Sequence, residues 1–194
     1  ATPGAGTFPG DTLIVDLAGT TGADVQVASF GAGRFTFTSS HLPIDYVSTE
    51  TLDPLNGQVT LGNIPFGAAD DTLGLSADSG DMIFSVDGNA ALRLPLASIT
   101  GPLVLDAAGG DDELIVDYTG GNPVPADGVV FNGQTQNTGT DGDSLSIVNG
   151  PMTEFSTQVL TYTDTTTGQG NNGNIQIDGG PVITYTGLEP INAG

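Results

Sequence analysis

The stretch that decides the fold of this chain is Ala107–Asp117, which reads AAGGDDELIVD. Two small residues and two glycines lead into adjacent aspartates, after which Leu and Val alternate with other residues. A related cassette, Asp-x-Leu followed by a spacer and an apolar residue, occurs four times. Its copies are Asp11–Val15 (DTLIV), Asp71–Leu75 (DTLGL), Asp112–Val116 (DELIV) and Asp143–Ile147 (DSLSI). Because a period of two is typical of a strand with one buried face, the chain repeats one strand-forming unit.

Signals for helices are almost missing. The 194 residues include 30 glycines and 12 prolines, and no ten-residue window combines helical periodicity with good helix formers. Short alternating segments remain, most of them bounded by Gly, Pro, Asn or Asp. They are Thr12–Leu17, Val25–Phe30, Arg34–Thr38, Val59–Ile64, Met82–Val86, Leu92–Leu96, Leu103–Leu105, Leu114–Tyr118, Val129–Phe131, Leu145–Val148, Val159–Tyr162, Ile175–Ile177 and Val182–Tyr185. We therefore predict an all-β protein.

The repeated unit is longer than the cassette, because residues 11–57 and 143–194 share five features in the same order. These are the cassette, a Gln-Val pair (Gln26–Val27, Gln158–Val159), a short strand (Phe35–Phe37, Ile175–Ile177), an I-x-Y triplet (Ile44–Tyr46, Ile183–Tyr185) and a closing signature (Leu52–Asn56, Leu188–Asn192). Residues 71–110 and 112–142 read as abbreviated copies. We predict one repeat-built β domain over residues 11–194, preceded by a Gly/Pro-rich arm or linker at residues 1–10.

Loosely repeated strands between turns predict a stack of short strands, a β-solenoid or parallel β-helix. An antiparallel β-sandwich is the alternative, because short strands at similar spacing describe that fold too. The first ten residues show no signal-peptide pattern, and the last copy closes at a glycine as the others do. We expect either a mature subunit or a module from a longer array.

The charge of the chain is strongly one-sided, with 23 acidic residues against two arginines and a net charge of −21. Nucleic acid and anionic membrane surfaces are excluded as partners, because both need basic side chains next to phosphates. No apolar run approaches the length of a membrane-spanning helix, so membrane insertion is not expected. The absence of cysteine excludes disulfides and thiolate metal sites. Acidity without lysine favours an extracellular or cell-surface setting.

Two of the turns resemble a known calcium-binding repeat. Gly109–Leu114 (GGDDEL) and Gly139–Leu145 (GTDGDSL) are similar to degenerate copies of the hemolysin-type (RTX) nonapeptide G-G-x-G-x-D-x-apolar-x. In that family Asp side chains and turn carbonyls bind calcium in a parallel β-roll. The resemblance implies calcium as a cofactor, with ligands at Asp111, Asp112, Asp141 and Asp143 and a weaker match at Asp70 and Asp71. An alternative is that each Asp caps a turn by accepting backbone hydrogen bonds.

On a wider scale the chain resembles the repeat regions of very large secreted bacterial surface proteins, of the planctomycete and cyanobacterial type. The residues that carry this resemblance are the D-T-L-x-V strands, the short acidic Gly turns and the closing segment Ile183–Pro190 (ITYTGLEP). It implies an exported bacterial surface or matrix module and supplies no catalytic residues.

Patterns that point to catalysis are few. His41 is the only histidine, and the chain has neither a cysteine nor a G-x-S-x-G elbow for it to serve. Enzymes acting on acidic polysaccharides need a basic residue, yet Arg34 and Arg93 both fall in alternating strand segments. A carboxylate pair suits glycoside hydrolysis, but the sequence singles out no pair among its 23 acids. We predict that the protein is not an enzyme.

Our main functional prediction is a secreted structural or adhesive module that associates with its own copies, as fibres or arrays. The reason is that the ends of a strand stack expose unpaired edges. Expected partners are its own copies or neighbouring repeats of a longer protein, with surface glycans as a further candidate. The alternatives are a calcium-dependent binding module and a polysaccharide-active β-helix enzyme.

Overall fold

The computed structural model describes residues 10–29, 31–62, 64–65, 67, 69–133, 142–148, 158–164, 170–188 and 191–193. Within these ranges the chain forms strands and one 3-10 turn, Leu96–Ser98, but no α-helix, so the prediction of an all-β protein is confirmed. The same ranges contain no helix long and apolar enough to cross a membrane. The strands are β1 (Asp11–Asp16), β2 (Ala23–Ser29), β3 (Ala32–Phe37), β4 (Ile44–Tyr46), β5 (Thr49–Leu55), β6 (Val59–Leu61), β7 (Ile64–Pro65), β8 (Thr72–Asp78), β9 (Asp81–Val86), β10 (Asn89–Pro95), β11 (Leu103–Ala107), β12 (Glu113–Asp117), β13 (Val129–Gly133), β14 (Ser144–Val148), β15 (Gln158–Asp164), β16 (Asn171–Ile177), β17 (Val182–Leu188) and β18 (Ile191–Ala193).

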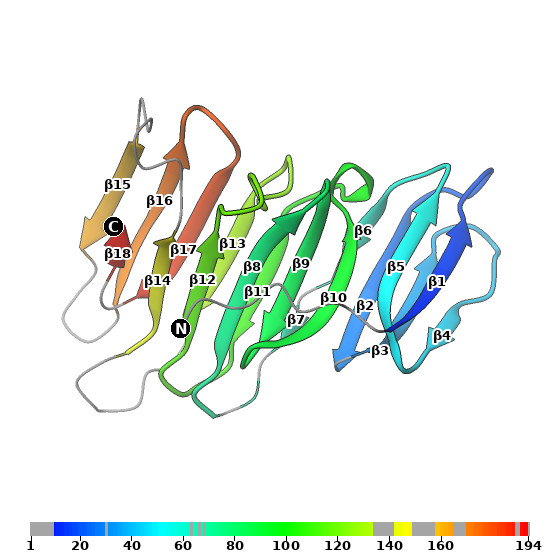
Figure 1. Cartoon of the computed structure of the whole chain (residues 1–194), viewed down its shortest axis with the longest axis horizontal. Coiled ribbons are helices and arrows are strands. Elements are labelled where there is room, and N and C mark those ends of the chain that lie inside the picture. The colour runs from blue at the N-terminus through cyan, green and yellow to red at the C-terminus, as the bar shows by residue number, and fades with distance from the viewer. Residues whose placement is uncertain are drawn as a thin grey trace.

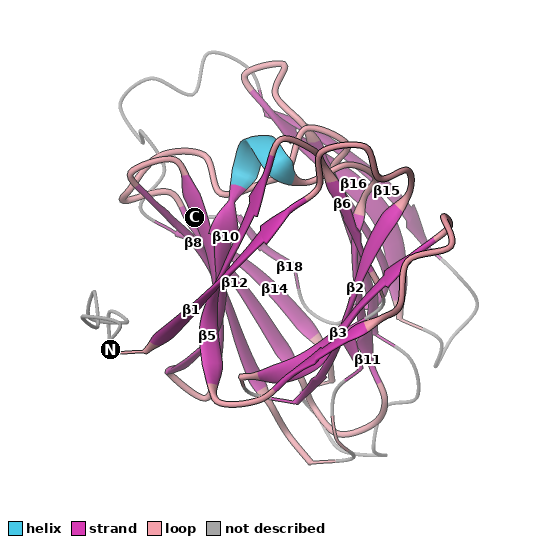
Figure 2. Ribbon diagram, turned by 90° about the vertical axis from the view of Figure 1, so that its right-hand side faces the viewer, coloured by secondary structure: helices cyan, strands magenta, loops and turns pink. Residues whose placement is uncertain are grey.

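These strands build three sheets that lie in two facing layers. Sheet A has the order β1-β5-β10-β9-β8-β12-β14-β18 and forms one layer. Sheet B (β4-β3-β2-β6) and sheet C (β15-β16-β17-β13-β11-β7) form the other. The end-on view in Figure 2 shows the two layers facing each other. Figure 1 shows that sheets B and C follow one another along the long axis, with the first strands at one end and the last strands at the other.

Both parallel and antiparallel ladders occur, and the path of the chain between two strands decides which kind they form. The antiparallel pairs join strands that are consecutive in the chain, as in β2-β3-β4, β8-β9-β10 and β15-β16-β17. The parallel pairs join strands that are separated by a visit to the opposite layer, such as β12 with β14. Two facing layers of mixed sheets fit a β-sandwich-like arrangement, although not the purely antiparallel one given as the alternative from sequence.

The three later cassettes become neighbouring strands of sheet A in a common register. Leu114 of β12 pairs with Leu73 of β8 on one side and with Leu145 of β14 on the other. Two residues further along each strand, Val116 pairs with Leu75 and Ile147 in the same way. The period-two pattern explains this register, because a slip of one residue would turn every Leu away from the core.

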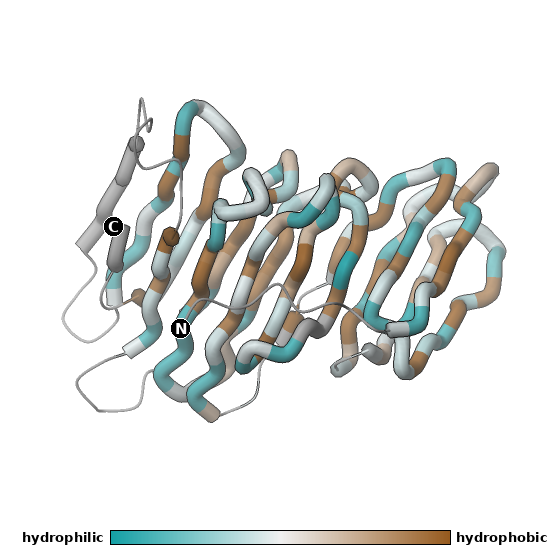
Figure 3. Tube along the Cα trace, in the orientation of Figure 1, coloured by the Kyte–Doolittle hydropathy of each residue, from teal (hydrophilic) through white to brown (hydrophobic). Residues whose placement is uncertain are grey.

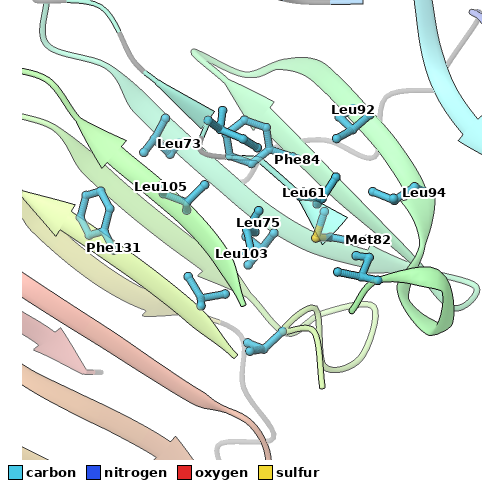
Figure 4. Close-up of a cluster of buried hydrophobic side chains, with 14 of the residues drawn as sticks. Leu61, Leu73, Leu75, Met82, Phe84, Leu92, Leu94, Leu103, Leu105 and Phe131 are labelled. Carbon is cyan, nitrogen blue, oxygen red and sulfur yellow. The ribbon is translucent and has the colours of Figure 1, made fainter. Parts of the chain in front are cut away.

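The core lies between the two layers. Leu73 and Leu75 reach it from sheet A, and Leu103, Leu105 and Phe131 reach it from sheet C, all of them fully buried. Figure 4 shows these side chains gathered between the strands. Burial alternates along β8 and β9 and along the first four residues of β12, with the apolar residues Ile83 and Ile115 at half-buried positions. Figure 3 shows hydrophobic and hydrophilic residues interspersed along the strands. One contiguous cluster of buried residues runs through both layers.

Three strands, β4, β5 and β18, lie outside the strand segments and cassettes identified from sequence, whereas β8 overlaps the cassette Asp71–Leu75. The clearest case is β5, which contains Asp53 and Pro54, two residue types that are rare in strands. Here Pro54 stands opposite Val15 of the edge strand β1, while Leu52 is fully buried opposite Leu13. Tertiary burial of Leu52 outweighs the weak local preference for a strand.

Candidate functional site

The predicted calcium ligands stack where the three later cassettes enter sheet A. Asp71, Asp112 and Asp143 directly precede β8, β12 and β14, and we call them the aspartate ladder. The backbone N–H of Asp71 donates to Oδ1 of Asp112 over 2.7 Å, and the N–H of Asp112 donates to Oδ1 of Asp143 over 2.8 Å. The carboxylates of Asp112 and Asp143 therefore each join two neighbouring cassettes, whereas Oδ2 of Asp71 accepts from the N–H of Gly67 in its own turn over 3.2 Å.

Backbone hydrogen bonds run alongside this ladder. The N–H of Glu113 donates to the carbonyl of Asp71 over 3.0 Å, and the N–H of Ser144 donates to the carbonyl of Asp112 over 2.7 Å. One residue earlier, the N–H of Asp111 donates to Oδ1 of Asp70 over 3.0 Å. The turns before the three strands are thus tied together by side chains and backbone at once.

Burial raises the pKa of two residues of the ladder. Asp112 and Asp143 are each only 1% exposed. Burial, followed by the nearby charges of Asp143, Asp71 and Asp70, raises the pKa of Asp112 to about 6, although its hydrogen bond to Asp71 acts in the opposite direction. Burial also raises the pKa of Asp143. The fold therefore favours the neutral form of Asp112 and Asp143 more than the unfolded chain does.

Two carboxylate oxygens in this region are buried without a hydrogen-bond partner in the described part of the chain, Oδ2 of Asp112 and Oδ1 of Asp111. A buried oxygen of this kind is costly unless a proton or a cation compensates its charge. No lysine exists in the chain, and both arginines pair elsewhere. Arg34 pairs with Asp45, and Arg93 pairs with Asp78 and Asp81.

Glycines give the ladder its close approach. Gly110, at a φ of +128°, lies so near the preceding turn that a Cβ would be 2.7 Å from the carbonyl oxygen of Ala69. A Cβ on Gly133 of β13 would be 2.6 Å from Oδ2 of Asp143. Both positions need glycine, because a side chain would collide with the ladder or with the turn beside it.

The structure brings together five of the six predicted ligands: Asp70, Asp71, Asp111, Asp112 and Asp143. The sixth, Asp141, lies outside the described residues. Within the described ranges no three carboxylate or histidine side chains converge in a way that would hold a metal ion. Calcium binding therefore stays a prediction. His41, at the surface, shares a hydrogen bond of 2.6 Å between its Nδ1 and the hydroxyl of Ser39.

The two ends of the body form a second candidate site. At the N-terminal end, β1 is the outermost strand of sheet A and β4 the outermost strand of sheet B. At the C-terminal end, β18 and β15 are the outermost strands of sheets A and C. Exposed large apolar residues gather toward the N-terminal end: of the six in the described chain, only Val182 lies outside residues 14–55. The other five are Ile14, Leu42, Ile44, Val47 and Leu55.

Leu42 and Val47 were not among the residues singled out from sequence, and Ile44 was noted only as part of the I-x-Y triplet. The match between Ile44–Tyr46 and Ile183–Tyr185 was the available signal. The sequence match makes Ile44 and Ile183 equivalent positions. Only the sheet order shows that Ile44 lies on an outermost strand and Ile183 on an inner one.

No family model, no curated protein and no solved structure matches this chain. Its function has to be argued from the aspartate ladder and the two ends.

Proposed function

We propose that the protein is a structural module of a bacterial extracellular surface or matrix and that it associates end to end with its own copies. One observation carries this proposal: the outermost strands of sheet A, β1 and β18, run in the same direction. Strands β1, β5 and β10 are parallel to one another. Strand β9 is antiparallel to both β10 and β8, and β8, β12, β14 and β18 are again parallel.

Equal direction matters because it lets one molecule continue the sheet of the next. A parallel pair of β18 with β1 would extend sheet A by the same kind of ladder that joins its inner strands. A contact between two different ends is not self-complementary, so it produces open chains and fibres, or rings where the rotation between molecules closes, rather than two-fold dimers. Unpaired strand edges favour such addition because their N–H and C=O groups seek partners.

We further propose that the fold is a wound stack of the β-solenoid type with hairpins inserted into its rungs. The support is the alternation of the chain between the layers, for example from β11 to β12, β13 and β14, with parallel pairing at each return. A stack of this type has no natural limit to its length, which suits a module that works by repetition.

The composition supports an extracellular location. A charge of −21 with no lysine and no cysteine gives a highly soluble chain that needs no reducing compartment. The same charge opposes association between copies, and salt screens this repulsion over a Debye length of about 8 Å at physiological ionic strength. End-to-end association is therefore expected to strengthen as salt is added.

Sedimentation velocity over a wide concentration range tests the proposal. We expect a series of species that are whole multiples of the monomer, with larger species at higher salt. Electron microscopy of the same samples should show filaments of one width. Monodisperse monomers at every concentration and salt would contradict the proposal.

A calcium-dependent binding module is a second candidate, favoured by the two buried, unpartnered oxygens of Asp111 and Asp112. A cation there would remove the cost of burying these charges without a partner. The test is a thermal melt at neutral pH with calcium and with chelator. Calcium should raise the Tm of the native protein and leave that of the Asp112→Asn variant unchanged, whereas equal midpoints with calcium and chelator would reject this candidate.

A further inference from the structure

The protein carries the same strand path at both of its ends. In the first unit the chain runs from β1 in sheet A through the meander β2-β3-β4 and returns to sheet A as β5, which pairs in parallel with β1. In the last unit it runs from β14 through the meander β15-β16-β17 and returns as β18, which pairs in parallel with β14. Where a strand in one unit has no neighbour, the equivalent strand in the other unit therefore shows which neighbour fits there.

The two meanders agree residue by residue. In the first, Ile44 stands opposite Phe35 and Tyr46 stands opposite Gly33. In the last, Ile183 stands opposite Ile175 and Tyr185 stands opposite Gly173. Ile44 and Ile183 therefore occupy equivalent positions on equivalent strands, β4 and β17.

The surroundings of these two isoleucines differ in one respect. Ile183 is 1% exposed, because β17 has β13 as its next neighbour and Val129 stands beside Ile183. Ile44 is 37% exposed, because β4 is the outermost strand of sheet B. The first unit has a position for a further parallel strand beside β4, and the last unit shows that position filled.

Sheet A shows the same contrast. Leu145 of β14 is fully buried between Leu114 and Ile191 on its two neighbours. Its counterpart Leu13 pairs only with Leu52 and is partly buried. Both layers therefore lack a neighbouring strand at the N-terminal end.

A strand beside β4 has to run parallel to it, and the outermost strand of sheet C at the C-terminal end, β15, has that direction. Strand β4 is parallel to β2, and β2 is parallel to β6. Val59 of β6 bridges in parallel to Ile99, and Ile64 of β7 pairs in parallel with Leu105, so the direction continues from sheet B into sheet C. Strands β11, β13, β17 and β15 keep it, which makes β15 parallel to β4.

Charge does not oppose contact at β4 itself. Its acidic residue, Asp45, forms hydrogen bonds with both Nε and Nη2 of Arg34, and this pairing lowers the pKa of Asp45. Arg34 is one of only two basic residues in the chain. The strand that would meet an acidic second molecule is therefore locally neutral, with Leu42 and Val47 on either side of it.

We propose that the N-terminal end of one molecule receives the C-terminal end of a second molecule, with β18 pairing in parallel with β1 and β15 pairing in parallel with β4. This inference rests on the proposed end-to-end association and adds its polarity and its contact strands. The apolar residues Leu42, Ile44 and Val47 become buried in the joint.

Two matched variants test the joint by sedimentation. Ile44→Asp places a charge at the proposed contact, and Val182→Asp adds the same charge at an equally exposed valine, 37%, on the inner strand β17. We expect Ile44→Asp to weaken self-association about tenfold or more, because an unpaired charge in an apolar contact is costly. Val182→Asp should stay within about twofold of the native protein. Leu42→Asp, at a side chain that is 84% exposed, repeats the test without touching the core.

A mixing experiment tests the polarity. A fluorescent Ile44→Asp chain keeps β15 and β18 intact, so it should join native oligomers once, at one end, and shorten them. Pairing of β4 with β4 would instead exclude it from the oligomers.

The possible outcomes separate this inference from the proposed function. If the native protein associates and Ile44→Asp associates equally well, or both Asp variants weaken it equally, the assigned joint is wrong while end-to-end association stands. If the native protein never associates, both are wrong. Selective loss with Ile44→Asp and Leu42→Asp, together with incorporation of the labelled chain at one end, supports the joint.

Discussion

Two cassettes with nearly the same residues, Asp11–Val15 and Asp112–Val116, reach different environments. In the second, Asp112 and Leu114 are almost fully buried, because β12 lies between β8 and β14. In the first, Asp11 is exposed and Leu13 is only partly buried, because β1 has β5 alone beside it. The cassette specifies a strand with one apolar face, whereas the neighbours decide whether its Asp is a surface carboxylate or a buried acid.

The hydrogen bonds of the two cassettes differ in the same way. In the inner cassette, the N–H of Asp112 donates to the carboxylate of Asp143, the equivalent residue of the next cassette. In the outer cassette, the N–H of Asp11 donates to Oε2 of Glu50 on β5 over 3.1 Å. A stack of cassettes provides its own acceptors, while the outer strand uses a side chain from its single neighbour.

Truncation of the first leucine in each cassette should give the largest difference in unfolding free energy between the two cassettes. Leu114→Ala removes a fully buried side chain and is expected to cost about 3–5 kcal/mol of unfolding free energy. Leu13→Ala, at the partly buried outer position, should cost about 1–2 kcal/mol. Denaturant unfolding measures both, and equal losses would show that β1 is covered as completely as β12.

The pH dependence of stability is the next largest effect. The pKa of Asp112 is raised to about 6, so the fold binds its proton more tightly than the unfolded chain does. The resulting stability is fully present below about pH 4 and is lost as pH rises through about 6, for a total of roughly 3 kcal/mol.

The matched control for this pH effect is Asp11→Asn, which removes the same charge from the outer cassette. Asp112→Asn should flatten the fall in Tm between acidic and neutral pH, while Asp11→Asn should leave the slope close to that of the native protein. Identical slopes in the two variants would mean that the pH effect comes from overall repulsion and not from the ladder.

Turn glycines should show a smaller difference. Gly110→Ala forces a Cβ against the carbonyl of Ala69 at a positive φ, with an expected cost of about 2–3 kcal/mol. Gly19→Ala also has a positive φ but faces open space after β1, so it should cost about 1 kcal/mol. Thermal unfolding checks the order, and a larger loss at Gly19 would contradict the close approach of the inner turns.

The smallest expected effect lies on the outer face of sheet A. Ser146 donates to Oε1 of Glu113 over 2.7 Å, linking β14 to β12, so Ser146→Ala should cost about 0.5–1 kcal/mol. Ile14 is the equivalent residue of the first cassette and is 59% exposed, so Ile14→Ala should stay within about 0.5 kcal/mol of zero. Both values come from denaturant unfolding of the monomer at low protein concentration.

Much of the local structure could be predicted from the sequence. The alternation of Leu and Val in each cassette indicated strands, and Leu73, Leu114 and Leu145 do point into one core. The I-x-Y triplets were matched from sequence, and their strands β4 and β17 hold equivalent registers. The closing signatures are less alike: Leu13 stands opposite Leu52, whereas Leu145 stands opposite Ile191, three positions further along the aligned signature. The two closing signatures therefore pair with their cassettes in different registers.

The sequence by itself determined that the chain forms short strands with one apolar face, because period-two alternation between Gly-rich turns permits little else. It did not determine which strands become neighbours, and the neighbouring strands decide which side chains are buried. Asp112 is buried with a raised pKa because two other cassettes flank it, and Ile44 is exposed because no strand lies on the outer side of β4. Burial and acidity are set by the surroundings of a side chain, and only the tertiary structure supplies those surroundings.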